Sequence, residues 1–293
     1  PVSASHEVLA EFREYERTST TVVDAYVRPP IQRYLTRLDE RATAAGVPTP
    51  RIMQSNGGIA DSTTVRERAV TTVLSGPAAG VISADAVETD REGLITFDMG
   101  GTSSDVSLVQ ESGAEITTDA EIDGRPISTP MVDIHTVGAG GGSIGWVDAG
   151  GALRVGPQSA GATPGPAAYG RGGTEPTVTD ANVVLGYMGE DAELGGDLSI
   201  DAEAAHAALD SLAEAAGLDD ILAAARGVYR VANATMTRAI RAVTVERGHD
   251  PRRFGLCAFG GAGPMHAAPI ADTLGVETVV VPYASGVRSA FGL

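Results

Sequence analysis

The stretch LITFDMGGTSSDVSLV, residues 94–109, restricts the possible folds of this chain more than any other segment. An apolar run leads into Asp98, two glycines and a threonine follow (Gly100, Gly101 and Thr102), and Asp105 opens a second apolar run. Glycines let backbone N–H groups curl around an anion, and the threonine hydroxyl can join them. Two carboxylates would repel a phosphate unless a divalent cation lay between them, as Mg²⁺ often does. We interpret the stretch as a metal–phosphate turn in a β-hairpin, although a plain tight turn remains an alternative for a Gly-Gly pair.

A second glycine turn follows an apolar strand in CAFGGAGPMHAAP, residues 257–269. Gly260, Gly261 and Gly263 precede Pro264, which is typical of the first turn of a helix. The N-terminus of a helix favours anions and polar ligand groups. Each glycine cluster is a weak signal alone, but the pair, separated by a long helical pattern, is more specific.

Strands alternate with helices along the chain, which predicts an α/β fold. We expect residues 1–90 to form a helical connector and strand region packing on the core, and residues 91–293 to form the nucleotide-binding domain with an insertion at about 138–217. The expected helices are 6–45 (which the prolines at 29 and 30 bend or break), 73–88, 199–217 with Ser199 as its cap, and 218–248 ending at Gly248. Residues 138–180 are rich in Gly and Pro, and such a long segment predicts functional or packed loops.

The composition limits the class of protein. The formal net charge is −17, and all 21 basic residues are arginine. This charge disfavours nucleic acid as a partner. The acidic, lysine-free composition fits either a GC-rich genome or a salt-adapted, halophile-type acidic proteome. The absence of an 18-residue apolar run or a signal peptide argues against a membrane partner, and the single Cys257 suits a cytoplasmic protein with a buried structural thiol.

The motifs together resemble one known family. SGPAAGV, FDMGGTSSDVSLV, TVGAGGGSIGWVDAGGALRVGPQSAGATPGPAAYGRGG and AFGGAGPMHA occur in this order and are similar to the hydantoinase A and 5-oxoprolinase family, within the actin, Hsp70 and sugar-kinase superfamily. The resemblance covers nearly the whole chain. It implies a ribonuclease-H-like fold and ATP-dependent opening of a cyclic amide such as a hydantoin or 5-oxoproline.

The resemblance also implies roles for individual residues. It assigns a phosphate motif to Asp98, Gly100, Gly101, Thr102 and Asp105, with Asp98 as the catalytic residue and Mg²⁺ ligand, and an adenosine motif to Gly260, Gly261 and Gly263. The implied cofactors are ATP and Mg²⁺, the substrate is a small cyclic amide, and the implied partner is a B-type subunit.

One departure from the family pattern affects this interpretation. The family carries a first phosphate hairpin in an N-terminal domain, whereas this sequence has a single such turn and begins without Met. We therefore expect the N-terminal half of the ATP clamp to be missing, which leaves three hypotheses. The chain is part of a cyclic amide hydrolase, the nucleotide-handling subunit of an acetone or acetophenone carboxylase, or a truncated, inactive assembly partner.

Several other residues have two possible roles. Asp133 and His135 could be two metal ligands on one strand face, but a hydrogen-bonded pair is favoured because two ligands do not close a site. His266 could reach a nucleotide or could pack, and Asp180 is expected to cap a helix. The GAGGGS loop, 138–143, could bind an anion or pack against another backbone. Arg238, Arg241 and Arg247 on the long helix are expected to form a solvated or acid-paired face.

Overall fold

The computed structural model describes residues 2–122, 124–189, 191–196 and 198–293, which form a mixed α/β fold. The residues group into two compact units: unit 1 contains 1–88, 109–134 and 289–293, and unit 2 contains 89–108 and 135–288. The sequence pattern suggested a division near residue 90. The contacts between residues place 109–134 in the same unit as the N-terminal residues. Among the described helices, none is both long enough and apolar enough to cross a membrane.

Unit 1 is mainly helical, with short two-stranded ribbons. Its elements are α1 (Ser5–Val8), α2 (Glu14–Ala44), β1 (Ile52–Met53), β2 (Ile59–Ala60), α3 (Ser62–Glu67), the 3₁₀ helix η1 (Ala69–Thr72), α4 (Ser75–Asp85), β5 (Gly113–Ala114), β6 (Ile116–Thr117), β7 (Ala120–Ile122), β8 (Arg125–Ile127) and β9 (Met131–Val132). Helix α4 begins at Ser75, where the Ser-Gly-Pro start signal lies.

Helix α2 continues through both of its prolines, so the break considered from the sequence does not occur. Tertiary contacts hold the helix on either side of them. The buried Asp24 carboxylate accepts a hydrogen bond from the backbone N–H of Val70 at 3.0 Å. Beyond the prolines, the Ser62 hydroxyl donates to Asp39 at 2.7 Å. Such contacts offset the hydrogen bonds that proline cannot donate.

Unit 2 is built on the central sheet. Its elements are β3 (Gly93–Met99), β4 (Ser104–Gln110), β10 (His135–Val137), β11 (Ser143–Val147), β12 (Leu153–Ser159), η2 (Ala167–Tyr169), α5 (Val178–Val184), β13 (Glu193–Leu194), β14 (Leu198–Ser199), α6 (Ala202–Ala216), α7 (Ile221–Val243), η3 (Val245–Arg247), η4 (Pro251–Arg253), β15 (Gly255–Phe259), α8 (Gly263–Leu274), β16 (Val279–Val280) and η5 (Ser285–Gly292), of which β4 and η5 end in unit 1.

The strand order of the central sheet is β10-β4-β3-β15-β16. Strand β10 is antiparallel to β4, whereas β3, β15 and β16 are parallel. Because only four residues join β3 to β4, these two strands form an antiparallel hairpin, as the sequence predicted. The parallel pair β3 and β15 places the ends of both predicted glycine-turn strands at the same edge of the sheet.

Several helix boundaries differ from the sequence predictions. The helix expected over 6–45 is interrupted, because α1 ends at Val8 and α2 begins at Glu14. Asp201, not Ser199, caps α6, and its side chain accepts from the N–H of Ala204. Helix α7 ends at Val243 rather than at Gly248, because the chain leaves the α-helical conformation at Thr244, and Gly248 instead ends the following 3₁₀ turn.

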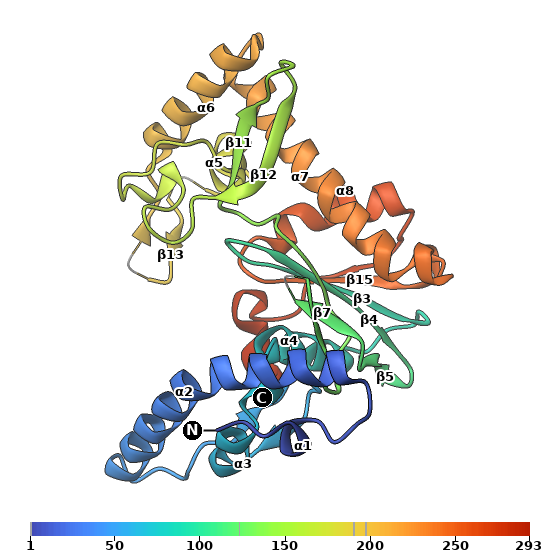
Figure 1. The fold of residues 1–293 in the computed structure, drawn as a ribbon. Coiled ribbons are helices and arrows are strands. Elements are labelled where there is room, and N and C mark those ends of the chain that lie inside the picture. The colour runs from blue at the N-terminus through green and yellow to red at the C-terminus, as the bar shows by residue number, and fades with distance from the viewer. Residues whose placement is uncertain (1, 123, 190, 197) are drawn as a thin grey trace. The chain divides into compact units, whose positions relative to one another are not determined.

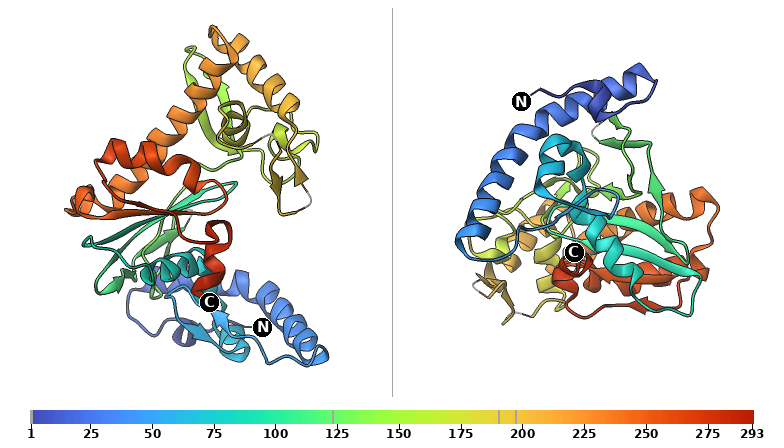
Figure 2. Two further views of the ribbon diagram at one scale, coloured as in Figure 1. Left: turned by 180° about the vertical axis from the view of Figure 1, so that it is seen from behind. Right: turned by 90° about the horizontal axis from the view of Figure 1, so that it is seen from below.

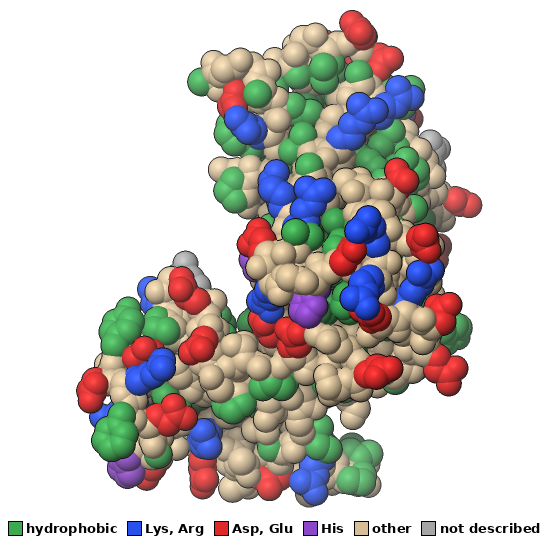
Figure 3. Space-filling view, turned by 90° about the vertical axis from the view of Figure 1, so that its right-hand side faces the viewer, with side chains coloured by type: hydrophobic (Ala, Val, Ile, Leu, Met, Phe, Trp, Pro, Cys, Tyr) green, Lys and Arg blue, Asp and Glu red, His purple; other side chains and the backbone are tan. Residues whose placement is uncertain are grey.

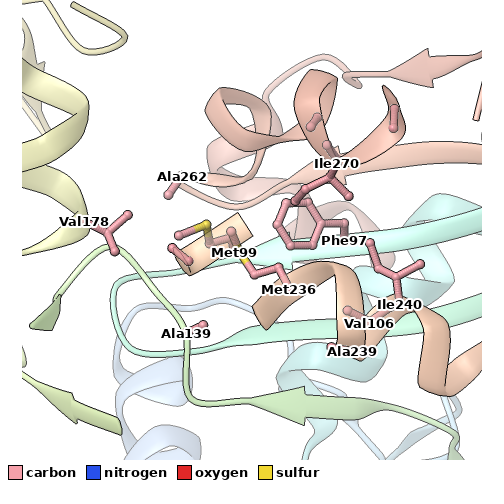
Figure 4. Packing of buried hydrophobic residues seen from close by; sticks show 14 of the residues in the cluster. Phe97, Met99, Val106, Ala139, Val178, Met236, Ala239, Ile240, Ala262 and Ile270 are labelled. Atoms are coloured by element: carbon pink, nitrogen blue, oxygen red, sulfur yellow. The ribbon is translucent and has the colours of Figure 1, made fainter. Parts of the chain in front are cut away.

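Helices α7 and α8 lie side by side against one face of the central sheet (Figures 1 and 2). Arginine and acidic side chains are interspersed on the surface that Figure 3 shows. Figure 4 shows the core between helices and sheet, where Phe97 and Met99 of β3 meet Met236 and Ile240 of α7 and Ile270 of α8. All five side chains are fully buried. This packing fixes the β3 end, from which the candidate site is built.

Candidate functional site

The β3–β4 turn is open to solvent. Gly100, Gly101 and Thr102 are exposed, while Asp98 and Asp105 on the flanking strands are partly buried. The N–H of Gly100 donates to the carbonyl of Ser103 at 3.0 Å and closes the turn. This internal bond uses the Gly100 amide. The amides of Gly101 and Thr102 make no backbone hydrogen bond within the described part of the chain, so they are the free donors of the turn.

The pKa values of both aspartates are raised, mainly by burial. Burial, and secondly the charge of Asp105, raises the pKa of Asp98 to about 6. Burial also raises the pKa of Asp105, while the Thr136 hydroxyl, which donates to Asp105 at 2.5 Å, lowers it in part. Among the described residues, none donates a hydrogen bond or forms an ion pair with Asp98. A half-buried carboxylate without a cationic partner suits a bound cation.

The second glycine turn lies directly against Asp98. Strand β15 pairs with β3 so that Phe259 is opposite Asp98, and the turn follows at once. Gly260 has φ +79°, and a Cβ there would overlap Asp98 Oδ1 and lie 2.5 Å from the Met99 carbonyl oxygen. The N–H of Ala262 donates to the same Met99 carbonyl at 3.0 Å. The structure therefore brings Asp98 and the Gly260–Gly263 turn together. The sequence shows that both segments are present, but it does not show that they are in contact.

The second turn also has an exposed, free amide. Gly261 is exposed, a Cβ added to it would meet nothing within 4 Å, and its N–H makes no backbone hydrogen bond among the described residues. Gly263, by contrast, is buried as the first residue of α8. Gly261 therefore faces open space, whereas Gly260 and Gly263 are needed for close packing.

The Gly-rich loop 138–143 packs against the first turn. The N–H of Gly141 donates to the Gly100 carbonyl at 2.9 Å, and that of Gly142 donates to the Gly101 carbonyl at 2.6 Å. A Cβ at Gly140 would lie 2.6 Å from the backbone carbon of Thr102. These contacts support the packing interpretation of the loop, because the glycines allow two backbones to touch.

His266 packs rather than facing the turn surface. It is fully buried in α8, its Nδ1 lies 2.6 Å from Asn233 Oδ1, and its Nε2 lies 3.1 Å from Asn182 Nδ2. Its ring stacks on Tyr229 with centroids 4.7 Å apart. Burial lowers the pKa of His266 to about 4, which keeps the imidazole neutral. We did not single out Asn182, Asn233 or Tyr229 from the sequence, because nothing local marks residues that meet across three helices.

The remaining sequence candidates have structural roles. The N-cap of α5 is Thr177 rather than Asp180. Asp180 completes a capping box by accepting from the Thr177 N–H, and its carboxylate also accepts from the N–H of Ala168 at 2.7 Å. Asp133 lies outside the strands and His135 begins β10, so the expected shared strand face does not form. Across the described residues, no group of three or more His, Cys, Asp or Glu is arranged to hold a metal ion. A cation at Asp98 would therefore need oxygen ligands from outside this carboxylate pair.

The fold defines a mixed α/β protein in which two glycine turns share one sheet edge. The chain belongs to the hydantoinase/oxoprolinase family, whose model matches residues 17–293. It is 44% identical to the caprolactamase subunit alpha of Pseudomonas jessenii over 99% of this chain and 42% of that protein. It is 38% identical to the 5-oxoprolinase of Saccharomyces cerevisiae, over 100% of this chain and 23% of that protein.

Two solved structures share the fold. The ATP-dependent caprolactamase of Pseudomonas jessenii matches with a TM-score of 0.85 at 43% identity, covering 99% of this chain and 42% of that one. A nucleotide-free structure of an acetone carboxylase, an enzyme of ATP-dependent acetone carboxylation, matches with a TM-score of 0.88 at 31% identity, covering 99% of this chain and 41% of that one. The chain thus spans less than half the length of each of these relatives.

Proposed function

We propose that this chain is the nucleotide-binding part of an ATP-dependent hydrolase that opens a cyclic amide. The observation that carries the proposal is the meeting of Asp98 with the Gly260–Gly263 turn at one sheet edge. Exposed amides of both turns make no backbone hydrogen bond there within the described part of the chain. The similarity to a caprolactamase and a 5-oxoprolinase supports a cyclic amide, of the hydantoin or 5-oxoproline type, as substrate.

The turn residues would position the nucleotide. In this proposal the N–H groups of Gly101 and Thr102 donate to phosphate oxygens, with Gly100 shaping the turn. Gly260, Gly261 and Gly263 lie on the adenosine side, where α8 begins and its helix dipole favours polar ligand atoms. Because phosphoryl transfer depends mainly on positioning and charge neutralisation, backbone donors on a rigid edge suit it.

Asp98 and Asp105 fit Mg²⁺, since both are half-buried oxygen donors and Asp98 lacks a cationic partner. Mg²⁺ prefers one or two carboxylates together with phosphate oxygens, and when bound it would neutralise phosphate charge. Asp98 is our proposed catalytic residue, which orients the cation or its water. Binding of a cation would lower the raised pKa of Asp98, so this carboxylate would stay charged at neutral pH.

The reaction that we propose begins with transfer of the terminal phosphoryl group of ATP to the amide oxygen. The carbonyl carbon then becomes electrophilic enough for attack by water. The ring C–N bond breaks as the nitrogen takes up a proton, which leaves an acyl phosphate, and a second water hydrolyses the acyl phosphate to a carboxylate and phosphate. The residues of this chain hold and orient the phosphoryl donor. We assign no base for the water.

Further parts of the proposal concern the fold and its setting. The antiparallel β10–β4–β3 group beside the parallel strands β15 and β16 supports a ribonuclease-H-like, actin-type core. The name of the relative, subunit alpha, supports a second, B-type subunit as partner. A missing N-terminal half of the clamp, a cytoplasmic location and salt adaptation remain predictions.

The test is ATP turnover by the full-length protein with its partner subunit, measured with hydantoin, 5-oxoproline or caprolactam present or absent. We expect a cyclic amide to stimulate ATP hydrolysis, and Asp98→Asn to abolish the stimulation. Asp219→Asn, on an exposed loop residue, is the matched control and should leave turnover unchanged. Equal turnover in wild type and Asp98→Asn would refute the role of Asp98.

The similarity to acetone carboxylase favours a second function, that of a nucleotide-handling subunit in ketone carboxylation. ATP turnover that requires acetone or acetophenone together with bicarbonate, and ignores cyclic amides, would establish it. The third hypothesis, an inactive assembly partner, predicts no heat of binding when ATP and Mg²⁺ are titrated into the 293-residue chain, and no turnover in the full-length complex.

A further inference from the structure

A groove of about 670 Å³ runs along α7, beside α8, and arginines dominate it. Arg226, Arg230, Arg238 and Arg241 of α7 line it, together with Tyr187 and Tyr229. We call this surface the arginine groove. None of the described residues that line it is an aspartate or glutamate, although the chain holds 38 acidic residues against 21 basic ones. On the face drawn in Figure 3, several basic side chains lie in the upper half, with acidic side chains among them.

The arginines lie on one helix face because of their spacing. Arg226, Arg230 and Arg241, with Asn233 and Thr237 between them, recur every three or four residues, so they share one stripe of α7. Arg238 lies at its edge. From Arg226 to Arg241 the helix rises about 22 Å.

The four arginines carry uncompensated charge. All four are exposed, and among the described residues none of them forms an ion pair with an acid. Arg238 donates to the neighbouring Thr235 hydroxyl, which leaves its charge unneutralised. Like charges one turn apart destabilise a helix. Arg238 and Arg241 thus fit the solvated alternative of the face expected from the sequence, and the groove is a positive surface on an acidic protein.

The floor of the groove is fixed and partly aromatic. The Tyr229 hydroxyl donates to the Met265 carbonyl at 2.7 Å, and Asn233 is held by His266. The rings of Tyr187 and Tyr229 lie 5.0 Å apart, and Tyr187 is 53% exposed. A rigid aromatic surface between cationic groups binds a ligand that has both charged and apolar parts.

We propose that the arginine groove binds an extended acidic segment of a partner protein. Charge complementarity identifies the chemistry of the occupant, and the length of the stripe favours an extended chain, since about seven residues of extended peptide span 22 Å. Carboxylates near both ends of the segment pair with Arg226 and Arg230 and with Arg238 and Arg241. An apolar residue between them rests on the two tyrosines. The proposal is independent of the ATP chemistry.

The test uses a fluorescein-labelled peptide, Glu-Glu-Ala-Trp-Ala-Ala-Glu-Glu, and measures its anisotropy as the 293-residue chain is added. We expect binding that weakens about tenfold or more when salt is raised from low to physiological concentration, because exposed charges are screened. The same peptide with lysine in place of glutamate should not bind.

Paired charge reversals locate the site. Arg226→Glu/Arg230→Glu and Arg238→Glu/Arg241→Glu should each weaken binding at least about tenfold, as loss of charge complementarity does. Arg33→Glu/Arg37→Glu, an exposed pair on α2 with the spacing of Arg226 and Arg230, changes the net charge equally and should leave binding within about twofold. Circular dichroism checks that each variant is folded.

Three results would overturn the proposal. Equal weakening by all three double variants would show a general charge effect, and weakening by one α7 pair alone would show a ligand too short for the stripe. Displacement of the peptide by tripolyphosphate at much lower concentration than by unlabelled peptide would assign the groove to small phosphate compounds.

Discussion

Gly260 and Asp98 approach so closely that a Cβ at Gly260 would overlap the Asp98 carboxylate. The contact joins two segments 162 residues apart, and it exists because β15 pairs in parallel with β3 and places Phe259 opposite Asp98. The position of the candidate site therefore depends on the register of one strand pair, and the predictions below test that edge and its surroundings.

Gly260→Ala should destabilise the protein by about 2–4 kcal/mol, since it combines a left-handed φ with overlap against backbone and carboxylate. Gly261→Ala is the matched control. It has open space and no positive φ, so its free energy of unfolding should change by less than about 0.5 kcal/mol. Urea unfolding of both variants measures the difference, and equal stability would contradict the close approach of Gly260 to Asp98.

Gly140→Ala should cost about 1–3 kcal/mol, because a methyl group would collide with the backbone of Thr102 and Ser103. Gly138→Ala, in the same loop with nothing within 4 Å, should be nearly neutral. Hydrogen exchange should also show faster exchange of the Gly141 and Gly142 amides in Gly140→Ala alone. Unchanged exchange there would show that the loop does not hold the turn.

Asp98→Asn should stabilise the cation-free protein at pH 8 by about 1–3 kcal/mol. The folded pKa of Asp98, about 6, lies above its usual value of 3.8, so the charged form opposes folding. The stability of the wild type that stems from this group is present below pH 3.8 and is lost as the pH rises through about 6. The gain from the substitution should shrink between pH 8 and pH 5, as thermal unfolding in EDTA can show. A pH-independent gain would mean that Asp98 has an ordinary pKa.

His266 should stay neutral throughout the range from pH 8 to pH 5, because burial lowers its pKa to about 4. Its folded pKa lies below the usual 6.5, so the stability that it contributes is present above pH 6.5 and is lost as the pH falls through about 4. The imidazole Cε1–H resonance, assigned by its disappearance in His266→Gln, reports the protonation state. A midpoint above pH 6 would contradict the buried network.

Cys257 should be inert to Ellman's reagent in the folded chain at pH 8. It is fully buried in β15, and burial raises its pKa to about 11. Guanidinium should expose one reactive thiol for each chain. Rapid reaction without denaturant would place Cys257 at an accessible surface, against the structural role inferred from the sequence.

Local patterns sufficed for the β3–β4 hairpin and the turn before α8, since each depends on residues adjacent in sequence. The same patterns placed the α7 end five residues late, at Gly248, because a helical periodicity does not show where the backbone leaves the helix. The contacts of Gly140–Gly142 with the first turn, and of His266 with two asparagines, join distant segments. The sequence does not show these distant contacts. It therefore allowed both a packing role and a ligand-binding role for the 138–143 loop and for His266.

Main-chain hydrogen bonds from Gly141 and Gly142 clamp the Gly100–Ser103 turn. Every residue carries the same peptide group, so the neighbouring side chains can be substituted widely without loss of these hydrogen bonds, provided that the glycines remain glycine. A protein built this way can reshape the walls around the turn, and with them the molecule it accepts, while the geometry of the turn itself stays constant.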